Sequence, residues 1–172
     1  EDKFYMIDQH AAHEKVLYER TVKTLASKEI TSQMVSPPLI LTLNMQEAAK
    51  LAEYQDYFQE LGFEIEPFGG KEYAVSAVPA NLYGLAEKDL FMELLDDLEY
   101  VSGKNTEMIL DKIASMSCRA AVKGNQRLST AEAKELIEEL LTLDNPYNCP
   151  HGRPTIISMS KQEIEKKFKR IV

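Results

Sequence analysis

Apolar and polar positions along this chain follow two periodicities, one typical of strands and the other of helices. Alternation with a period of two, or a short unbroken apolar run, predicts a strand, whereas apolar residues every three or four positions predict an amphipathic helix. Strands are expected at 4–7, 39–43, 63–70, 71–79 and 155–159. Helices are expected at 8–29, 45–62, 86–101, 106–122, 131–143 and 161–170. This mixture predicts the α+β class.

Short polar residues mark where several of the expected helices begin. Asp8 and Asn44 stand directly before helical patterns, and Thr130 is expected to cap the helix that follows it. The segment 30–38 contains two prolines and is expected to be an irregular connection, as is the segment 144–154.

The order of these elements predicts two lobes. One lobe is expected to combine the ends of the chain, residues 1–29 and 116–172, and an external α/β lobe is expected to be inserted between them at 30–115. No internal repeat or low-complexity tract interrupts this plan. The chain starts almost at once with a strand, which suggests a piece of a longer protein.

Composition narrows the classes of protein. A chain that is 44% hydrophobic and 28% charged can build a core and is not expected to be disordered. No apolar run approaches the roughly 20 residues that cross a bilayer, and no signal peptide is recognisable. Two cysteines, Cys118 and Cys149, cannot form a disulfide scaffold and favour a reducing, intracellular setting. A net charge of −8 disfavours non-specific DNA binding, so a nucleic-acid role would need a basic patch, metal ions or another domain.

Metal-binding side chains gather in the segment 8–19. His10 and Glu14 are four residues apart, which places them on one face of a helix, with Asp8 at its mouth. His13 falls on nearly the same face. Glu19 is nine residues from His10, about half a turn away, and is expected to point elsewhere.

Two other segments complete the set. Cys149 and His151 are two residues apart, so in an extended segment both would project to the same side, and both are good zinc ligands. Cys118 lies late in its helix. All three histidines and both cysteines of the chain fall in these segments. Taken alone, the His10–Glu14 pair could be an ordinary surface pair, and Cys118 could be a buried small side chain. Taken together, the three segments predict a metal site, either hydrolytic or structural.

The stretch DQHAAHEKVLYE, residues 8–19, resembles the endonuclease motif DQHA-x2-E-x4-E of the MutL mismatch-repair family. The stretches SCRAAVKGNQRLS, residues 117–129, and CPHGRP, residues 149–154, resemble the second and third motifs of that family, in the same order. The resemblance covers essentially the whole chain. It implies the C-terminal domain of a bacterial MutL protein, in which the lobe formed by the chain ends is the dimerisation lobe.

The resemblance implies a homodimeric, metal-dependent endonuclease that nicks one strand of duplex DNA in mismatch repair. Asp8 and Glu14 are then the catalytic candidates. The expected metal-site residues are Asp8, His10, Glu14, Cys118, Cys149 and His151. Zinc is expected in a structural or regulatory role on Glu14, Cys149 and His151, with Mn²⁺ or Mg²⁺ on the Asp8 side during cleavage. Glu19 is expected to play a supporting role.

The resemblance also implies partners. Bacterial members carry a sliding-clamp motif, Q-x-x-[LI]-x-P, which QMVSPP at 33–38 matches at Gln33 and Pro38. Ser36 occupies the position of the apolar residue that should enter a pocket on the clamp, so Val35 is expected to take that role instead. The alternative is a proline-rich connection with no role in binding. The other implied partners are a MutS-type mismatch recognition protein and the N-terminal ATPase half of the same chain. A cytoplasmic, nucleoid-associated location and no membrane contact are expected.

Basic residues near the motifs are the candidates for contact with DNA. They are Arg153, Lys123 and Arg127, followed by the C-terminal group Lys166, Lys167, Lys169 and Arg170. Anchoring of a loop by Arg153, and a solvated helix face for the C-terminal group, are the alternatives.

The principal alternative function is a non-catalytic dimerisation and clamp-docking module with a structural zinc site. A zinc hydrolase acting on small substrates is a second alternative. A structural site is expected to be closed by four protein ligands, whereas a nuclease site leaves positions open for water. The dimer interface is expected on the first strand and on the last strands and helices.

Overall fold

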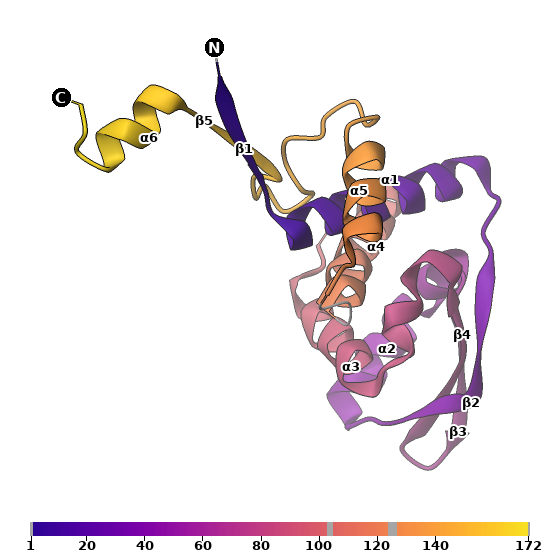
Figure 1. Cartoon of the computed structure of the whole chain (residues 1–172). Helices are drawn as coiled ribbons and strands as arrows, with labels where there is room; N and C mark the ends of the chain where they lie inside the picture. Colours follow the sequence, from indigo (N-terminus) through magenta and orange to yellow (C-terminus); the bar gives the residue numbers. More distant parts are fainter. Residues whose placement is uncertain (1, 103–104, 124–126, 172) are drawn as a thin grey trace. The chain divides into compact units, whose positions relative to one another are not determined.

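Strands and helices are mixed along the chain in the structure, a computed structural model that describes residues 2–102, 105–123 and 127–171 (Figure 1). The strands are β1 (Lys3–Ile7), β2 (Ser32–Thr42), β3 (Glu64–Gly69), β4 (Glu72–Pro79) and β5 (Ile156–Ser160). The helices are α1 (Gln9–Ser27), α2 (Met45–Glu60), α3 (Lys88–Asp97), α4 (Thr106–Lys123), α5 (Thr130–Leu140) and α6 (Lys161–Lys167), with short 3-10 helices η1 (Ala80–Ala86) and η2 (Leu98–Tyr100). The predicted α+β class is confirmed.

The segment 30–38 differs from its prediction, because most of it belongs to β2. The pairing of β2 with β4 shifts register between Met34 and Leu39, and both prolines fall in that interruption. β2 also lies at an edge of its sheet. A proline cannot donate to a ladder of hydrogen bonds, so an irregular stretch of an edge strand is the place that tolerates it.

Two of the three predicted helix caps are confirmed, and the third is wrong by one residue. The Asp8 carboxylate accepts a hydrogen bond from the backbone N–H of Ala11 at 3.0 Å. Asn44 forms a capping box at the start of α2. At α5 the cap is Ser129 and not Thr130, because Ser129 exchanges hydrogen bonds with Glu132 three residues later.

Contacts divide the chain into two compact units. The terminal unit consists of Glu1–Val16 and Leu128–Val172, and the central unit is Leu17–Arg127. The structure therefore divides the chain after residues 16 and 127, whereas the sequence predicted divisions after residues 29 and 115. The difference arises because the second half of α1 and the end of α4 contribute buried side chains to the core of the central unit.

The central unit is a three-stranded antiparallel sheet, ordered β2-β4-β3, packed against helices (Figure 1). Phe58, Phe63 and Phe91 form an aromatic cluster in its core, with ring centroids 5.2 to 6.3 Å apart. A Cβ atom on Gly84 would lie 2.5 Å from the carbonyl oxygen of Ala121. Glycine at this position therefore allows η1 to approach the backbone of α4.

A polar network lies inside the central unit. The Asn81 side-chain amide donates to the hydroxyl of Thr21 at 2.7 Å, and that hydroxyl donates to the Leu17 carbonyl at 2.8 Å. The Thr21 hydroxyl also lies 3.6 Å from the Cys118 thiol. These bonds join α1 to η1 and α4, so they fix the position of this part of α1.

The terminal unit contains an antiparallel ribbon of β1 and β5. The ribbon pairs Ile7 with Ile156, and both pack against a small core formed by Ala12, Val16 and Leu140. The other face carries Phe4, Met6, Ile157 and Met159, which the register places side by side.

Among the helices of the described residues, none combines the length and the apolar character that a membrane-spanning segment needs.

Candidate metal centre

Glu14 reaches the candidate centre from the first half of α1. The Asp8 cap fixes the start of this helix, and the backbone N–H of Asp8 donates to the carbonyl of Thr155 at 2.9 Å. The side chain of Glu14 is only 5% exposed. A carboxylate held away from water requires a polar or cationic partner, because burial of an unpaired charge is costly.

Cys149 and His151 come from the loop between α5 and β5. This loop is irregular, as was expected, and it forms a tight turn around Gly152. The Cys149 N–H donates to the carbonyl of Arg153, and the Gly152 N–H donates to the carbonyl of Cys149, both at 2.9 Å. Gly152 has a φ of 82°, a conformation that favours glycine. The turn, and not strand alternation, therefore sets the directions of the two side chains.

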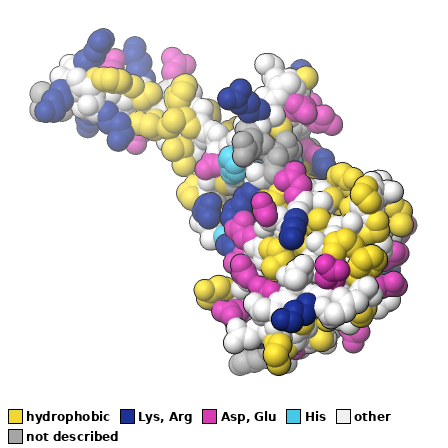
Figure 2. Space-filling model, turned by 90° about the horizontal axis from the view of Figure 1, so that it is seen from below, with side chains coloured by type: hydrophobic (Ala, Val, Ile, Leu, Met, Phe, Trp, Pro, Cys, Tyr) yellow, Lys and Arg dark blue, Asp and Glu magenta, His cyan; other side chains and the backbone are white. Residues whose placement is uncertain are grey.

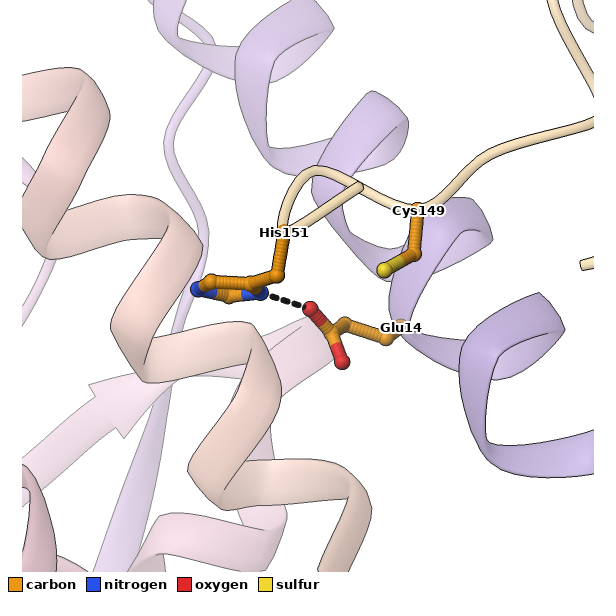
Figure 3. A group of neighbouring side chains, drawn as sticks. All are labelled: Glu14, Cys149 and His151. Carbon is orange, nitrogen blue, oxygen red and sulfur yellow. Dashed lines mark hydrogen bonds and ion pairs between the residues drawn. The ribbon is translucent and has the colours of Figure 1, made fainter. Parts of the chain in front are cut away.

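These two segments bring three metal-binding side chains together (Figure 3). A carboxylate oxygen of Glu14, the Cys149 sulfur and a ring nitrogen of His151 all lie within 4.8 Å of one another. His151 Nδ1 and Glu14 Oε1 are hydrogen-bond partners. Carboxylate, thiolate and imidazole are all zinc donors, and three protein ligands leave a fourth position for water. The donor set therefore fits a zinc ion.

The other expected metal-site residues are not members of this group among the described residues. Asp8 and His10 are exposed, and Asp8 uses one carboxylate oxygen to cap α1. Cys118 is fully buried in the central unit, where its sulfur lies close to the Thr21 hydroxyl. Within the described residues, only Glu14, Cys149 and His151 meet as a ligand group. Metal binding by Asp8, His10 and Cys118 stays a prediction.

The basic candidates have different surroundings. Lys123 forms an ion pair with Glu93, so its charge is balanced by a neighbouring carboxylate. Arg127 and Arg153 are exposed. Figure 2 shows Lys and Arg side chains gathered over the α6 end of the terminal unit. Lys166 and Lys167 lie in the last turn of that helix.

The segment with the expected clamp motif lies along β2. Gln33, Ser36 and Pro38 are exposed. Val35 is 8% exposed and belongs to the hydrophobic core, whereas Met34 is 60% exposed. A role for Val35 in docking would require its removal from the core, so Met34 is the apolar side chain that a partner can reach. Sequence reasoning missed Met34, because the segment was expected to be an irregular connection and tertiary packing decides the burial of Val35.

Comparison with known proteins gives the family. The family model described as the MutL C terminal dimerisation domain matches residues 1–128. A DNA mismatch repair protein MutL from Agathobacter rectalis is 61% identical over 173 residues, an alignment that covers 100% of this chain and 27% of that protein.

Two clostridial relatives give the same result. DNA mismatch repair protein MutL from Clostridium botulinum strain Eklund 17B is 46% identical, and the same protein from Clostridium beijerinckii is 43% identical, each over 169 residues and 98% of this chain. The chain spans 25% and 26% of these two proteins, about a quarter of their length. The chain therefore belongs to the family of MutL C-terminal dimerisation domains.

Proposed function

We propose that this domain is a metal-dependent DNA-nicking module that acts as a homodimer in mismatch repair. The observation that carries the proposal is the group formed by Glu14, Cys149 and His151, whose ligand atoms lie within 4.8 Å of one another. The names of the relatives, DNA mismatch repair protein MutL, support duplex DNA as the substrate.

The donor set supports zinc at this group, with Mn²⁺ or Mg²⁺ as the ion used in cleavage on the Asp8 side. A bound divalent ion would polarise a phosphoryl oxygen and favour ionisation of a water molecule. Glu14 and His151 orient each other through their hydrogen bond. Because the His151 side chain is 25% exposed, water reaches one side of the group while Glu14 stays buried.

Asp8 is the proposed catalytic carboxylate. It is exposed at the first turn of α1, six residues before Glu14, and its side chain is held by the Ala11 N–H. A fixed, solvent-facing carboxylate can hold a water molecule or an ion against a phosphodiester without first having to be ordered. Glu14 contributes the second carboxylate.

The apolar face of the β1–β5 ribbon supports dimerisation through the chain ends. Phe4, Met6 and Ile157 are 56%, 38% and 47% exposed, and their register places them on the face opposite the small core. A two-stranded ribbon is marginally stable by itself, and a contiguous apolar face indicates an interaction surface. A second copy that covers this face would protect it from water.

The acidic charge of −8 favours the alternative, a non-catalytic dimerisation and clamp-docking module with structural zinc. The ion pair between Lys123 and Glu93 points the same way, because it removes one candidate for phosphate contact. In that case DNA, the sliding clamp and the MutS-type protein would be engaged by the full-length chain with its ATPase half, without cleavage by this domain.

Nicking of supercoiled plasmid by the purified domain, at low salt with Mn²⁺, tests the proposal. We expect open circles from the wild type and from Glu135→Gln, an exposed carboxylate on α5, and none from Asp8→Asn. Nicking that persists in Asp8→Asn would contradict the catalytic assignment. A zinc-loaded full-length protein that does not nick DNA, even with the clamp added, would establish the non-catalytic alternative.

A further inference from the structure

Strand β3 has one unpaired edge. It lies at the outside of the sheet and pairs with β4 alone among the described strands (Figure 1). In an antiparallel edge strand, every second residue directs its N–H and C=O away from the sheet, where another extended chain can pair with them. Pro67 has no N–H, so this edge is available mainly over 64–66.

A groove lies between this edge and α2. It encloses about 180 Å³ and is lined by Gln55, Phe58 and Gln59 of α2 and by residues 63–66. Phe58, Phe63 and Ile65 contribute apolar atoms to this lining, and the two glutamines and two glutamates contribute polar ones. Sites for drug-sized ligands usually enclose roughly 300–1,000 Å³. A groove of this size suits a single side chain of a peptide better than a whole small molecule.

Carboxylates outnumber cations in the chain segments that line the groove, which Lys50 and Lys71 border. The stretch 51–70 contains five carboxylates and no Lys, Arg or His. Lys50, just before this stretch, lies 3.6 Å from the Glu53 carboxylate. Glu64 and Glu66 flank the buried Ile65, and strand alternation therefore places both carboxylates on the solvent face of the sheet. A segment that binds here would meet apolar groups on one side and carboxylates on the other.

We propose that the β3 edge and this groove form a docking site for an extended, Lys- or Arg-bearing peptide segment of a partner protein. The peptide would pair with the free backbone groups of residues 64–66 as an added strand. Its side chains would alternate, since those of any strand do. Every second side chain would point toward α2, one of them into the groove, and the cationic ones between them would face Glu64 and Glu66.

Charge and proline on an edge strand also protect a sheet against aggregation. Protection alone requires no groove beside the strand. The apolar lining contributed by Phe58 and Ile65 is the feature that favours docking. The inference is independent of the proposed nuclease activity, because every residue in it lies in the central unit and none belongs to the metal group.

A labelled synthetic peptide tests the inference. The probe has about seven residues in which Lys alternates with Val, Thr and Leu, so that it matches both sides of the site. Binding to the complete domain is measured by fluorescence anisotropy at about 0.05 M salt, where charge interactions are weakly screened. Amide chemical shifts of the protein locate the bound peptide. We expect shifts confined to 55–66 and to the paired residues of β4.

Two comparisons identify the forces. Glu64→Lys/Glu66→Lys should weaken binding at least tenfold, whereas Glu29→Lys/Glu135→Lys, an equal change of charge at exposed positions elsewhere, should weaken it less than threefold. A peptide N-methylated at alternate residues on its pairing edge should bind at least tenfold more weakly. The same modification on its other edge should be tolerated.

Three results would overturn the inference. They are equal weakening by both charge-reversed variants, no effect of N-methylation on either edge, and chemical shift changes spread over the acidic surface. Each would mean that the peptide binds the net charge of the domain and that the acidic edge only protects the sheet. Thermal unfolding of each variant confirms that it is folded before binding is measured.

Discussion

Glu14 and His151 are hydrogen-bond partners although 137 residues separate them in the chain. One comes from a helix and the other from a tight turn, and Cys149 completes the group. Each segment has its own local support, the Asp8 cap for the helix and the hydrogen bonds around Gly152 for the turn. The two supports hold the ligand atoms close together without requiring the rest of the loop to be regular.

Removal of a ligand should weaken zinc binding. We expect Cys149→Ser and His151→Ala to weaken zinc binding at least tenfold, because loss of one of three donors leaves an incomplete site. Competition with a colorimetric chelator measures the affinity. Glu135→Gln should behave as the wild type. Cys118→Ser should keep its zinc, since the three donors meet without it, and loss of zinc in that variant would assign Cys118 to the site.

A charge placed on the apolar face of the ribbon should separate the dimer. We expect Ile157→Asp to weaken dimerisation at least tenfold, because its side chain would be buried against a second copy. Sedimentation equilibrium over a range of concentrations measures this. The matched control is Ser158→Asp, the next residue on the opposite face of the same strand. Equal weakening by both variants would show that the ribbon itself, and not this face, has been disturbed.

The buried hydroxyl of Thr21 should contribute more to the stability of the domain than the hydroxyl of Thr24 on the same helix. Thr21→Val leaves the Asn81 amide without its acceptor, so we expect a loss of about 1–3 kcal/mol in the free energy of unfolding. The Thr24 hydroxyl also donates to the carbonyl four residues earlier, that of Arg20, but Thr24 lies near the surface. Thr24→Val should change stability by no more than about 0.5 kcal/mol. Urea denaturation distinguishes the two, and similar losses would contradict the network's importance.

Tyr18 should make the domain sensitive to alkali. Burial, followed by the hydrogen bond from its hydroxyl to the Asp111 carboxylate, raises the pKa of Tyr18 above its ordinary value of 10.0. The unfolded chain therefore loses this proton first. The stabilisation is complete below pH 10.0 and is lost as the pH rises through the pKa of the folded state.

Urea denaturation at a series of pH values tests this dependence. Stability should fall less steeply above pH 10.0 in Tyr18→Phe than in the wild type. The control is Tyr100→Phe, which alters a tyrosine that is 77% exposed. An unchanged slope in Tyr18→Phe would show that other groups cause the loss of stability.

Met34 and Val35 should have opposite roles in β2. Val35→Ala should cost about 1–3 kcal/mol of stability, because Val35 is buried in the core. Met34→Ala should leave stability nearly unchanged and weaken binding to an immobilised sliding clamp. Met45→Ala, at an 86% exposed methionine outside the segment, is the control. Clamp binding that survives Met34→Ala would mean that the segment is an ordinary edge strand.

The sequence by itself determined the features that depend on neighbours in the chain. The caps at Asp8 and Asn44 were predictable because each bonds to backbone groups within three residues. The metal-binding residue types were also recognisable, but of the two pairs that spacing suggested, His10 with Glu14 and Cys149 with His151, only the second is in the ligand group of the described residues. The cap at Ser129 was missed by one residue because Ser and Thr adjoin there, and the partner Glu132 alone distinguishes them.

The tertiary structure decided which distant segments meet. Sequence spacing gave no reason to place His151 against Glu14 while Cys118 packs beside Thr21, because such contacts depend on how the intervening chain folds back. The same holds for Val35, whose burial follows from the helices that cover one face of its sheet. Local hydrogen bonds are fixed by covalent proximity, whereas burial and long-range ligand groups arise only when the packed core excludes the alternatives.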